Sequence, residues 1–214
     1  MLIPDIFDRY PEYQPRKGVL HVGAHTLEEE PLYYRLGLTD AQILWIEANE
    51  DLIPKAKAKT NILCAVIGNT DDAEVTLKIT NNLQSSSILS LKTHLQEHPW
   101  VQETTRRVVK TITLDTLFER HQIAFDQFDC MNLDIQGAEK MALEGATRIL
   151  PHIRSIYTEV NVKELYEQCA QMDELDGFLE PLGFRRVETV MTPHGWGDAF
   201  YINIKLKNSD EETP

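Results

Sequence analysis

The sequence predicts an α/β fold with a doubly wound, mostly parallel sheet of the Rossmann-like type. Short apolar segments alternate with helical segments along most of the chain, which predicts parallel strands with helices on both faces. The connection between the last two apolar segments is too short for a crossover helix, so these two are expected to form an antiparallel pair.

The first half of the chain begins with an arm, residues 1–17, which contains three prolines and is expected to pack irregularly on the domain. The segments expected to form strands are 19–23, 43–48, 62–67 and the half-exposed 74–80. The segments expected to be helical are 31–37, 51–60 and a turn within 91–100, which follows a polar loop at 81–90.

The second half continues the alternation, passing from strand to helix around Leu114 within 106–120. Further strands are expected at 128–135, 153–160, 184–191 and 199–206, and helical segments at 136–150 and 163–183. The loop PHGWGD (193–198) joins the last two strands. We expect one domain over 18–207 and a disordered acidic tail over 208–214.

Composition narrows the classes of partner. The 214 residues carry a formal net charge of −13, which disfavours binding to nucleic acid or to anionic membranes. No apolar run approaches the length of a membrane span. The three cysteines are scattered without CxxC spacing, which indicates a reducing, cytoplasmic setting. The sequence does not indicate an oligomeric state.

The predicted order of elements also favours one kind of nucleotide-binding fold. A doubly wound sheet that ends in an antiparallel strand pair is the layout of class I methyltransferases. A dinucleotide dehydrogenase would instead continue with a second βαβαβ half.

The turn after the first expected strand differs from a pyrophosphate-binding loop. Such a loop needs several glycines, but here Gly23 is the only one, and Glu28, Glu29 and Glu30 follow it. Carboxylates at this place disfavour NAD or FAD and suit a cation, such as the sulfonium and ammonium of S-adenosylmethionine (SAM). Alternatively, the acidic residues only complement the dipole of the next helix.

The second expected strand ends at Glu47, in the sequence LWIEANE. An acidic residue at this place accepts hydrogen bonds from the ribose hydroxyls of an adenosine cofactor. NAD and SAM share that ribose, so Glu47 does not distinguish them. A solvent-facing strand end is the alternative reading.

The stretch NLDIQGAE places Asp134 at the end of a further strand, just before an abrupt turn at Gly137. Ligands of open α/β sheets bind beyond the carboxyl ends of the strands, so Asp134 is expected to face the same crevice as Gly23 and Glu47. The chain here resembles the FkbM family of SAM-dependent methyltransferases. The matching pieces are VGAH (22–25), WIEAN (45–49), AVIG (65–68), TLDTL (113–117) and LDIQGAE (133–139), within about residues 18–205.

The resemblance implies a class I methyltransferase that most commonly methylates a hydroxyl, here on a small molecule or glycan. The chain departs from the family pattern at His21, where aspartate is common, and at His25, where asparagine is common. The resemblance implies that the first turn lines the methionine part of SAM, Glu47 the ribose and the AVIG segment the adenine. The expected cofactor-binding residues are His21, Gly23, Ala24, His25, Glu47, Ala48, Val66, Ile67, Asp134 and Gln136.

A hydroxyl acceptor must lose its proton, so a carboxylate or histidine is expected in reach of it. Asp134 is the first candidate, although it is equally suited to anchoring the cofactor ammonium. Further candidates are Glu159, His194 and Asp198, and the hydroxyls of SSSIL (85–89) are expected beside the acceptor. No metal site is expected, because His94 and His98 have no third ligand nearby.

Two other functions remain open. The altered first turn allows a non-catalytic relative that keeps the fold as a binding module. An NAD-dependent oxidoreductase is disfavoured by the missing GxGxxG pattern and by the terminal strand pair.

Overall fold

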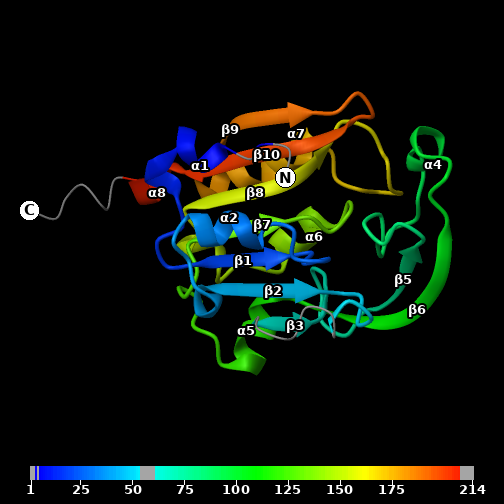
Figure 1. Cartoon of the computed structure of the whole chain (residues 1–214), viewed down its shortest axis with the longest axis horizontal. Helices are drawn as coiled ribbons and strands as arrows, with labels where there is room; N and C mark the ends of the chain where they lie inside the picture. Colours follow the sequence, from blue (N-terminus) through cyan, green and yellow to red (C-terminus); the bar gives the residue numbers. More distant parts are fainter. Residues whose placement is uncertain (1–2, 4, 54–60, 208–214) are drawn as a thin grey trace, which may run out of the picture.

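A computed structural model describes residues 3, 5–53 and 61–207 (Figure 1). Most of the expected helix at 51–60, and the whole expected tail at 208–214, lie outside the described residues. The central sheet has seven strands in the order β3-β2-β1-β7-β8-β10-β9. Their bounds are β1 Val19–Val22, β2 Ile43–Glu47, β3 Ile62–Cys64, β7 Cys130–Leu133, β8 Ser155–Asn161, β9 Phe184–Met191 and β10 Trp196–Asn203.

The five strands from β3 to β8 are parallel, as the sequence predicts. β1, β2, β7 and β8 are buried along their whole length, which is why each reads as a continuous apolar run. Successive side chains alternate between two cores. Leu20 and Leu44 face the larger core, and Val19 and Ile43 face the smaller one.

Helices cover both faces of the sheet (Figure 1). The larger core includes residues of α5, α6 and α7, whereas the smaller core includes residues of α1 and α2. The helix bounds are α1 Ile6–Arg9, α2 Glu30–Arg35, α4 His94–Glu97, α5 Leu114–His121, α6 Glu139–Glu144, α7 Met172–Leu179 and α8 Ile204–Lys207, with 3-10 turns at Pro11–Tyr13, Asp40–Gln42, Leu150–His152 and Glu180–Leu182. α5 begins where the hydroxyl of Thr113 accepts a hydrogen bond from the amide of Thr116.

The last two strands confirm the predicted antiparallel pair. β10 runs antiparallel both to β9 and to β8, and therefore lies between them. With this arrangement the molecule has the predicted class I methyltransferase fold.

A second, three-stranded sheet projects beyond the carboxyl ends of the parallel strands (Figure 1). It contains β4 (Val66–Ile67), β6 (Glu103–Ile112) and β5 (Glu74–Thr80). The prediction of one strand over 62–67 was wrong. The chain leaves the central sheet at Ala65, and Val66 and Ile67 then pair with β6.

Two other boundaries were also predicted wrongly. The segment 163–171 is not helical, because Leu165, Tyr166 and Cys169 turn inward to form a small core with the segment 89–91. The loop between the last strands is shorter than PHGWGD, since β10 already begins at Trp196. At its other end β10 stops at Asn203, and the rest of the predicted strand forms α8.

Within the arm, α1 and the turn Pro11–Tyr13 pack on the smaller core. The amide of Ile3 donates a hydrogen bond of 3.0 Å to the hydroxyl of Tyr157 on β8. All three cysteines are free thiols. Among the described residues, no helix is both long and apolar enough to cross a membrane.

Candidate functional site

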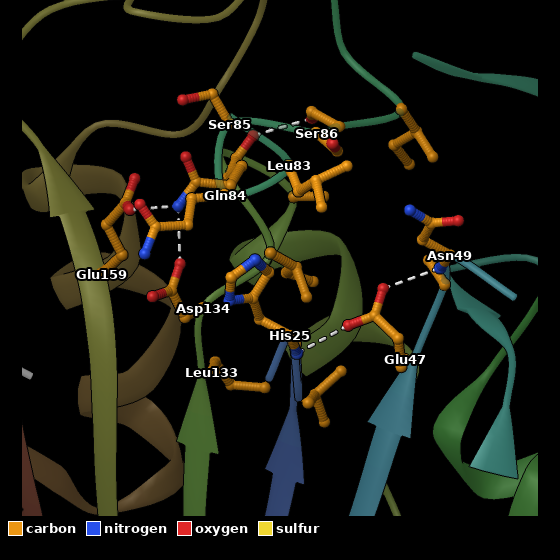
Figure 2. A pocket seen from close by; sticks show the side chains of 18 of the residues that line it. His25, Glu47, Asn49, Leu83, Gln84, Ser85, Ser86, Leu133, Asp134 and Glu159 are labelled. Carbon is orange, nitrogen blue, oxygen red and sulfur yellow. Dashed lines mark hydrogen bonds between the residues drawn. The ribbon is translucent and has the colours of Figure 1, made fainter. Parts of the chain in front are cut away.

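A cavity of about 620 Å³ opens at the carboxyl ends of β1, β2, β7 and β8. Its floor is formed by the residues that end these strands, and its roof by parts of the segment 82–101 between β5 and β6 (Figure 2). The volume falls within the range of small-molecule and cofactor sites.

The turn after β1 depends on Gly23. Its φ of +98° lies in the left-handed region, and a Cβ there would stand 1.8 Å from the carbonyl oxygen of Asp134. β1 therefore passes so close to the end of β7 that no side chain fits. The amides of Gly23 and Ala24 both donate to the carbonyl of Ile46 on β2, which fixes the turn to the sheet.

A buried chain of hydrogen bonds holds the same turn from below. The amide of Asn132 donates to the Tyr33 hydroxyl, which lies 2.8 Å from Nδ1 of His21, and Nε2 of His21 lies 3.2 Å from the carbonyl oxygen of Gly23. That carbonyl only accepts, so Nε2 of His21 carries the proton. Burial lowers the pKa of His21 to about 4, and the ring is neutral at neutral pH.

Glu47 connects the turns after β1 and β2. Its carboxylate accepts hydrogen bonds from the backbone amides of His25 (2.8 Å) and Asn49 (2.7 Å). Burial raises its pKa, and these hydrogen bonds oppose the rise. Each oxygen keeps acceptor capacity for a ligand hydroxyl. His25 lies between Glu47 and Asp134 (Figure 2), and its Nδ1 is 3.1 Å from the Glu28 carboxylate.

Asp134 and Glu159 lie on either side of one amide group, that of Gln136. Its Nε2 donates to Asp134 at 2.6 Å and to Glu159 at 2.7 Å. Glu159 on β8 is directly opposite Asp198 on β10, whose carboxylate accepts from the hydroxyl of Tyr157. Three predicted carboxylates therefore meet at one side of the cavity.

The turn that carries Gln136 is held by Glu139, at the start of α6. The buried Glu139 carboxylate accepts hydrogen bonds from the amides of Ile135 (2.9 Å) and Gly137 (3.1 Å). Gly137 has a φ of +97°, and a Cβ there would lie 2.9 Å from that of Cys169. The motif LDIQGAE is thus a turn braced by its own last residue.

Burial and mutual repulsion raise the pKa values of three acids at this side of the cavity, Asp134, Glu159 and Glu139. Enclosure by protein raises the pKa of Asp134, although its side chain is open to the cavity, and the charge of Asp198 adds to the rise. Burial, followed by the charges of Asp134 and Glu139, raises the pKa of Glu159 well above its usual range. Burial also raises the pKa of Glu139.

The other side of the cavity is formed by loops. Ser87 donates to the backbone carbonyl of Gln136 at 2.8 Å, and the buried Tyr166 hydroxyl donates to its side-chain oxygen at 2.6 Å. Aromatic and imidazole rings line the same side, namely those of His94, His98, Trp100, Tyr166 and Trp196.

Most of the predicted site residues line this cavity: His21, Gly23, His25, Glu47, Ala48, Val66, Ile67, Asp134, Gln136, Glu159 and Asp198. Ala24 is buried beneath the first turn and does not line it. His194 also lies outside the lining, because its turn points to α4, where Nδ1 is 2.9 Å from the Glu97 carboxylate. The geometry thus gives His194 a contact between two loops.

Sequence reasoning missed Tyr166, Tyr157 and the Asn132–Tyr33 pair as parts of the site. Tyr166 lies in a segment predicted as helix. The hydroxyls of SSSIL were expected beside the acceptor, and its serines Ser85, Ser86 and Ser87 line the cavity. Tyr33 and Asn132 contribute through a contact between α2 and β7, for which one sequence carries no local signal.

The charge of the lining is one-sided. Six carboxylates line the cavity: Glu28, Glu29, Glu47, Asp134, Glu159 and Asp198. Among the described residues that line it, none is Lys or Arg. In the described ranges, no group of three or more His, Cys, Asp or Glu residues has the arrangement of a metal site.

Comparisons with known proteins identify relatives of the chain. The model of the methyltransferase FkbM domain matches residues 21–186. The 2-O-methyltransferase NoeI of Sinorhizobium fredii (strain NBRC 101917 / NGR234) is 36% identical over 83 residues, which are 39% of this chain and 33% of the relative. The match thus spans about a third of that relative's length.

Solved structures with similar folds share little sequence with the chain. The magnesium protoporphyrin IX methyltransferase ChlM of Synechocystis PCC 6803, with bound SAM, has a TM-score of 0.46 and 9% identity, covering 94% of this chain and 76% of ChlM. A putative O-methyltransferase from Klebsiella pneumoniae has a TM-score of 0.46 and 12% identity, covering 94% of this chain and 78% of its own.

Proposed function

The chain belongs to the FkbM methyltransferase family, and from this premise we propose that it transfers a methyl group from SAM to a hydroxyl oxygen. The acceptor is a small molecule or a glycan. The name of NoeI, a 2-O-methyltransferase, supports an oxygen acceptor.

The observation that carries the proposal is the charge of the cavity. Six carboxylates and no Lys or Arg, among the described lining residues, make it a poor site for a diphosphate and a good one for a cation. The residues present therefore fit SAM, which carries a sulfonium and an ammonium group, and disfavour NAD.

The parts of the cavity correspond to parts of this cofactor. Gly23 and His25 of the first turn line the cavity, Glu47 has acceptor capacity for ribose hydroxyls, and Val66 and Ile67 offer an apolar surface for adenine. When bound, SAM supplies a methyl group on a positively charged sulfur, which leaves as a neutral sulfide.

Asp134 is suited to take the proton that the acceptor hydroxyl loses as its oxygen forms the bond to the methyl carbon. Its raised pKa brings it closer to neutral pH, where a general base works best. Glu159 and Asp198 are placed to bind further polar groups of the acceptor. Parts of the segment 82–101 cover the cavity and would limit the access of water once the substrates are bound.

Calorimetric titration with SAM, with its demethylated product and with NAD tests the cofactor. We expect both sulfur compounds to bind and NAD not to bind; tight binding of NAD alone would refute the proposal. Incubation with labelled SAM and a library of hydroxylated compounds, with mass-spectrometric detection of one added CH₂, then tests the transfer.

A non-catalytic SAM-binding module is the second candidate. It is favoured by the altered first turn, in which His21 and His25 stand where the family commonly has aspartate and asparagine. SAM binding without transfer to any compound of the library would support this candidate.

The free thiols support a cytoplasmic location, and the acidic surface supports the absence of a nucleic-acid partner.

A further inference from the structure

Gln136 has a hydrogen-bonding arrangement in which every polar atom of its side chain is used. Its two amide hydrogens match two acceptors, at 2.6 Å on Asp134 and 2.7 Å on Glu159. Its side-chain oxygen accepts from the hydroxyl of Tyr166 at 2.6 Å. The nearest oxygens of the two carboxylates are therefore at most two hydrogen-bond lengths apart.

The orientation of this amide is determined by its partners. In the flipped orientation the Gln136 oxygen would face Asp134, whose ionised carboxylate only accepts hydrogen bonds. The observed orientation avoids this clash of acceptors, and its side-chain oxygen accepts from the Tyr166 hydroxyl.

The backbone also places Gln136 specifically. Its φ of +57° lies in the left-handed region, which is unfavourable for a residue with a side chain. The turn is stabilised from both sides, by Glu139 accepting from the amide of Gly137 and by Ser87 donating to the carbonyl of Gln136. The fold thus maintains a strained residue whose side chain lies between two acids.

The groups around the pair are almost all acidic or neutral. Glu159 is faced by Asp134 at the end of β7, Glu139 of α6, Asp198 of β10 and the Tyr166 hydroxyl of the loop 162–171. The amide of Asn161 is a further neutral neighbour, at 3.4 Å. Glu29 adds negative charge on the far side of Asp134.

We propose that Gln136 is a positioning residue that holds Asp134 and Glu159 as a pair with a single proton, carried by Glu159. Asp134 then keeps the charge that faces the cavity and is ready to receive the acceptor's proton. The inference deepens the proposed methyl transfer and rests on it for the role of Asp134.

The placement of the proton follows from burial. Glu159 is buried and lies between Asp134 and Asp198, whereas Asp134 is open to the cavity. Two adjacent carboxylates ionise in turn, and the one that is further from solvent keeps its proton longer. The raised pKa of Glu159, from burial and then from the charge of Asp134, agrees with this assignment.

Infrared difference spectroscopy of the cofactor-free protein tests the proton directly. In the difference between the wild type and Glu159→Gln at pH 7, we expect one carbonyl band of a protonated carboxyl that the variant lacks, whereas a band of the buried Glu139 is common to both proteins and cancels. In Asp134→Asn the band should disappear at a lower pH than in the wild type, because the neighbouring charge is gone. An identical band in Glu159→Gln would overturn the assignment of the proton.

The variant Gln136→Met tests the positioning role, because it keeps the length of the side chain and removes both donors. Without them the pKa of Asp134 rises further, so the affinity for SAM, a cation, should begin to fall at a pH about one unit higher than in the wild type. Gln84→Met is the matched control, since Gln84 also lines the cavity but its amide is 3.4 Å from Glu28.

Equal pH profiles for Gln136→Met, Gln84→Met and the wild type would overturn the role of Gln136. If the wild type does not bind SAM at all, the proposed function fails. The infrared band of the cofactor-free protein still decides whether the pair shares one proton, so the two failures are distinguishable.

Discussion

On one side the cavity is lined by the ends of parallel strands, and on the other by loops that contact one another beyond the sheet. The sheet side comprises Gly23, Glu47 and Asp134, each at or just after the end of a strand. The loop side comprises segments 82–101 and 162–171, joined by an ion pair between Lys92 and Glu164.

The two sides are held in place by different interactions. On the sheet side, backbone hydrogen bonds to neighbouring strands fix each position to the register of the sheet. On the loop side, side chains bond to distant loops, as Thr93 does to the carbonyl of Glu164. From this comparison we propose that the sheet side binds the cofactor and that the loop side selects the acceptor.

The largest effect is expected from Gly23→Ala. The new Cβ would overlap the Asp134 carbonyl, so β1 or β7 must move, and we expect a loss of roughly 4 kcal/mol in the free energy of unfolding and of all SAM binding. Thermal denaturation and calorimetry measure both. Gly37→Ala is the control, because its φ of +84° is also left-handed but nothing lies within 4 Å, and about 1 kcal/mol is expected. Equal losses in the two variants would contradict the close approach.

Asp134→Asn is expected to lower the rate of methyl transfer by about 10²–10⁴-fold, because the general base is lost. The affinity for SAM should change much less than the rate. The measurement is single-turnover transfer to an acceptor found in the screen. Asp126→Asn, which removes an exposed carboxylate before β7, should leave the rate unchanged. A rate within a few-fold of the wild type in Asp134→Asn would move the base to Glu159 or Asp198.

Glu47→Gln should weaken SAM binding by roughly 10–100-fold, since hydrogen bonds to a charged group are worth about 1.5–3 kcal/mol. Calorimetry measures the dissociation constant, and a thermal melt verifies that the turn still folds. Glu50→Gln is a suitable control, because its exposed carboxylate forms an ion pair with Arg107 and does not line the cavity. Unchanged affinity in Glu47→Gln would refute its role at the ribose.

The smallest effect is expected on the loop side, from Trp100→Ala. This ring lines the cavity although 64% of the residue is exposed. We expect KM for the acceptor to rise by up to about tenfold, since an aromatic contact contributes about 1 kcal/mol, with no change in SAM affinity. Leu95→Ala, exposed on the same segment but outside the cavity lining, should change neither. A selective loss of SAM affinity in Trp100→Ala would break the division into two sides.

The same division explains what the sequence predicts. Gly23, Glu47 and Asp134 were identified because strand ends can be located from apolar runs, and parallel strands bring their carboxyl ends to one edge. Their convergence in one cavity confirms that reasoning. The roles assigned to them stay proposals that the variants above test.

The positions of the residues on the loop side could not be predicted from sequence patterns. Histidine is a residue type that often acts in functional sites, so His194 was a candidate. The turn that carries it instead contacts Glu97, which lies almost a hundred positions earlier in the chain. Tyr166 reaches the cavity only because segment 163–171 leaves the helical pattern to pack on Leu89 and Leu91. Such contacts depend on tertiary packing, which a local period of hydrophobicity does not encode.

The position of β10 in the sheet has a consequence for protein synthesis. It is synthesised after every other strand of the central sheet, yet it separates β8 from β9, so until residue 203 has emerged the edge of β8 that faces away from β7 has no partner. Asp198 cannot stand opposite Glu159 before that moment. Until β10 has paired, the nascent chain therefore has an open sheet edge that is prone to aggregation, and the set of carboxylates at the cavity is incomplete.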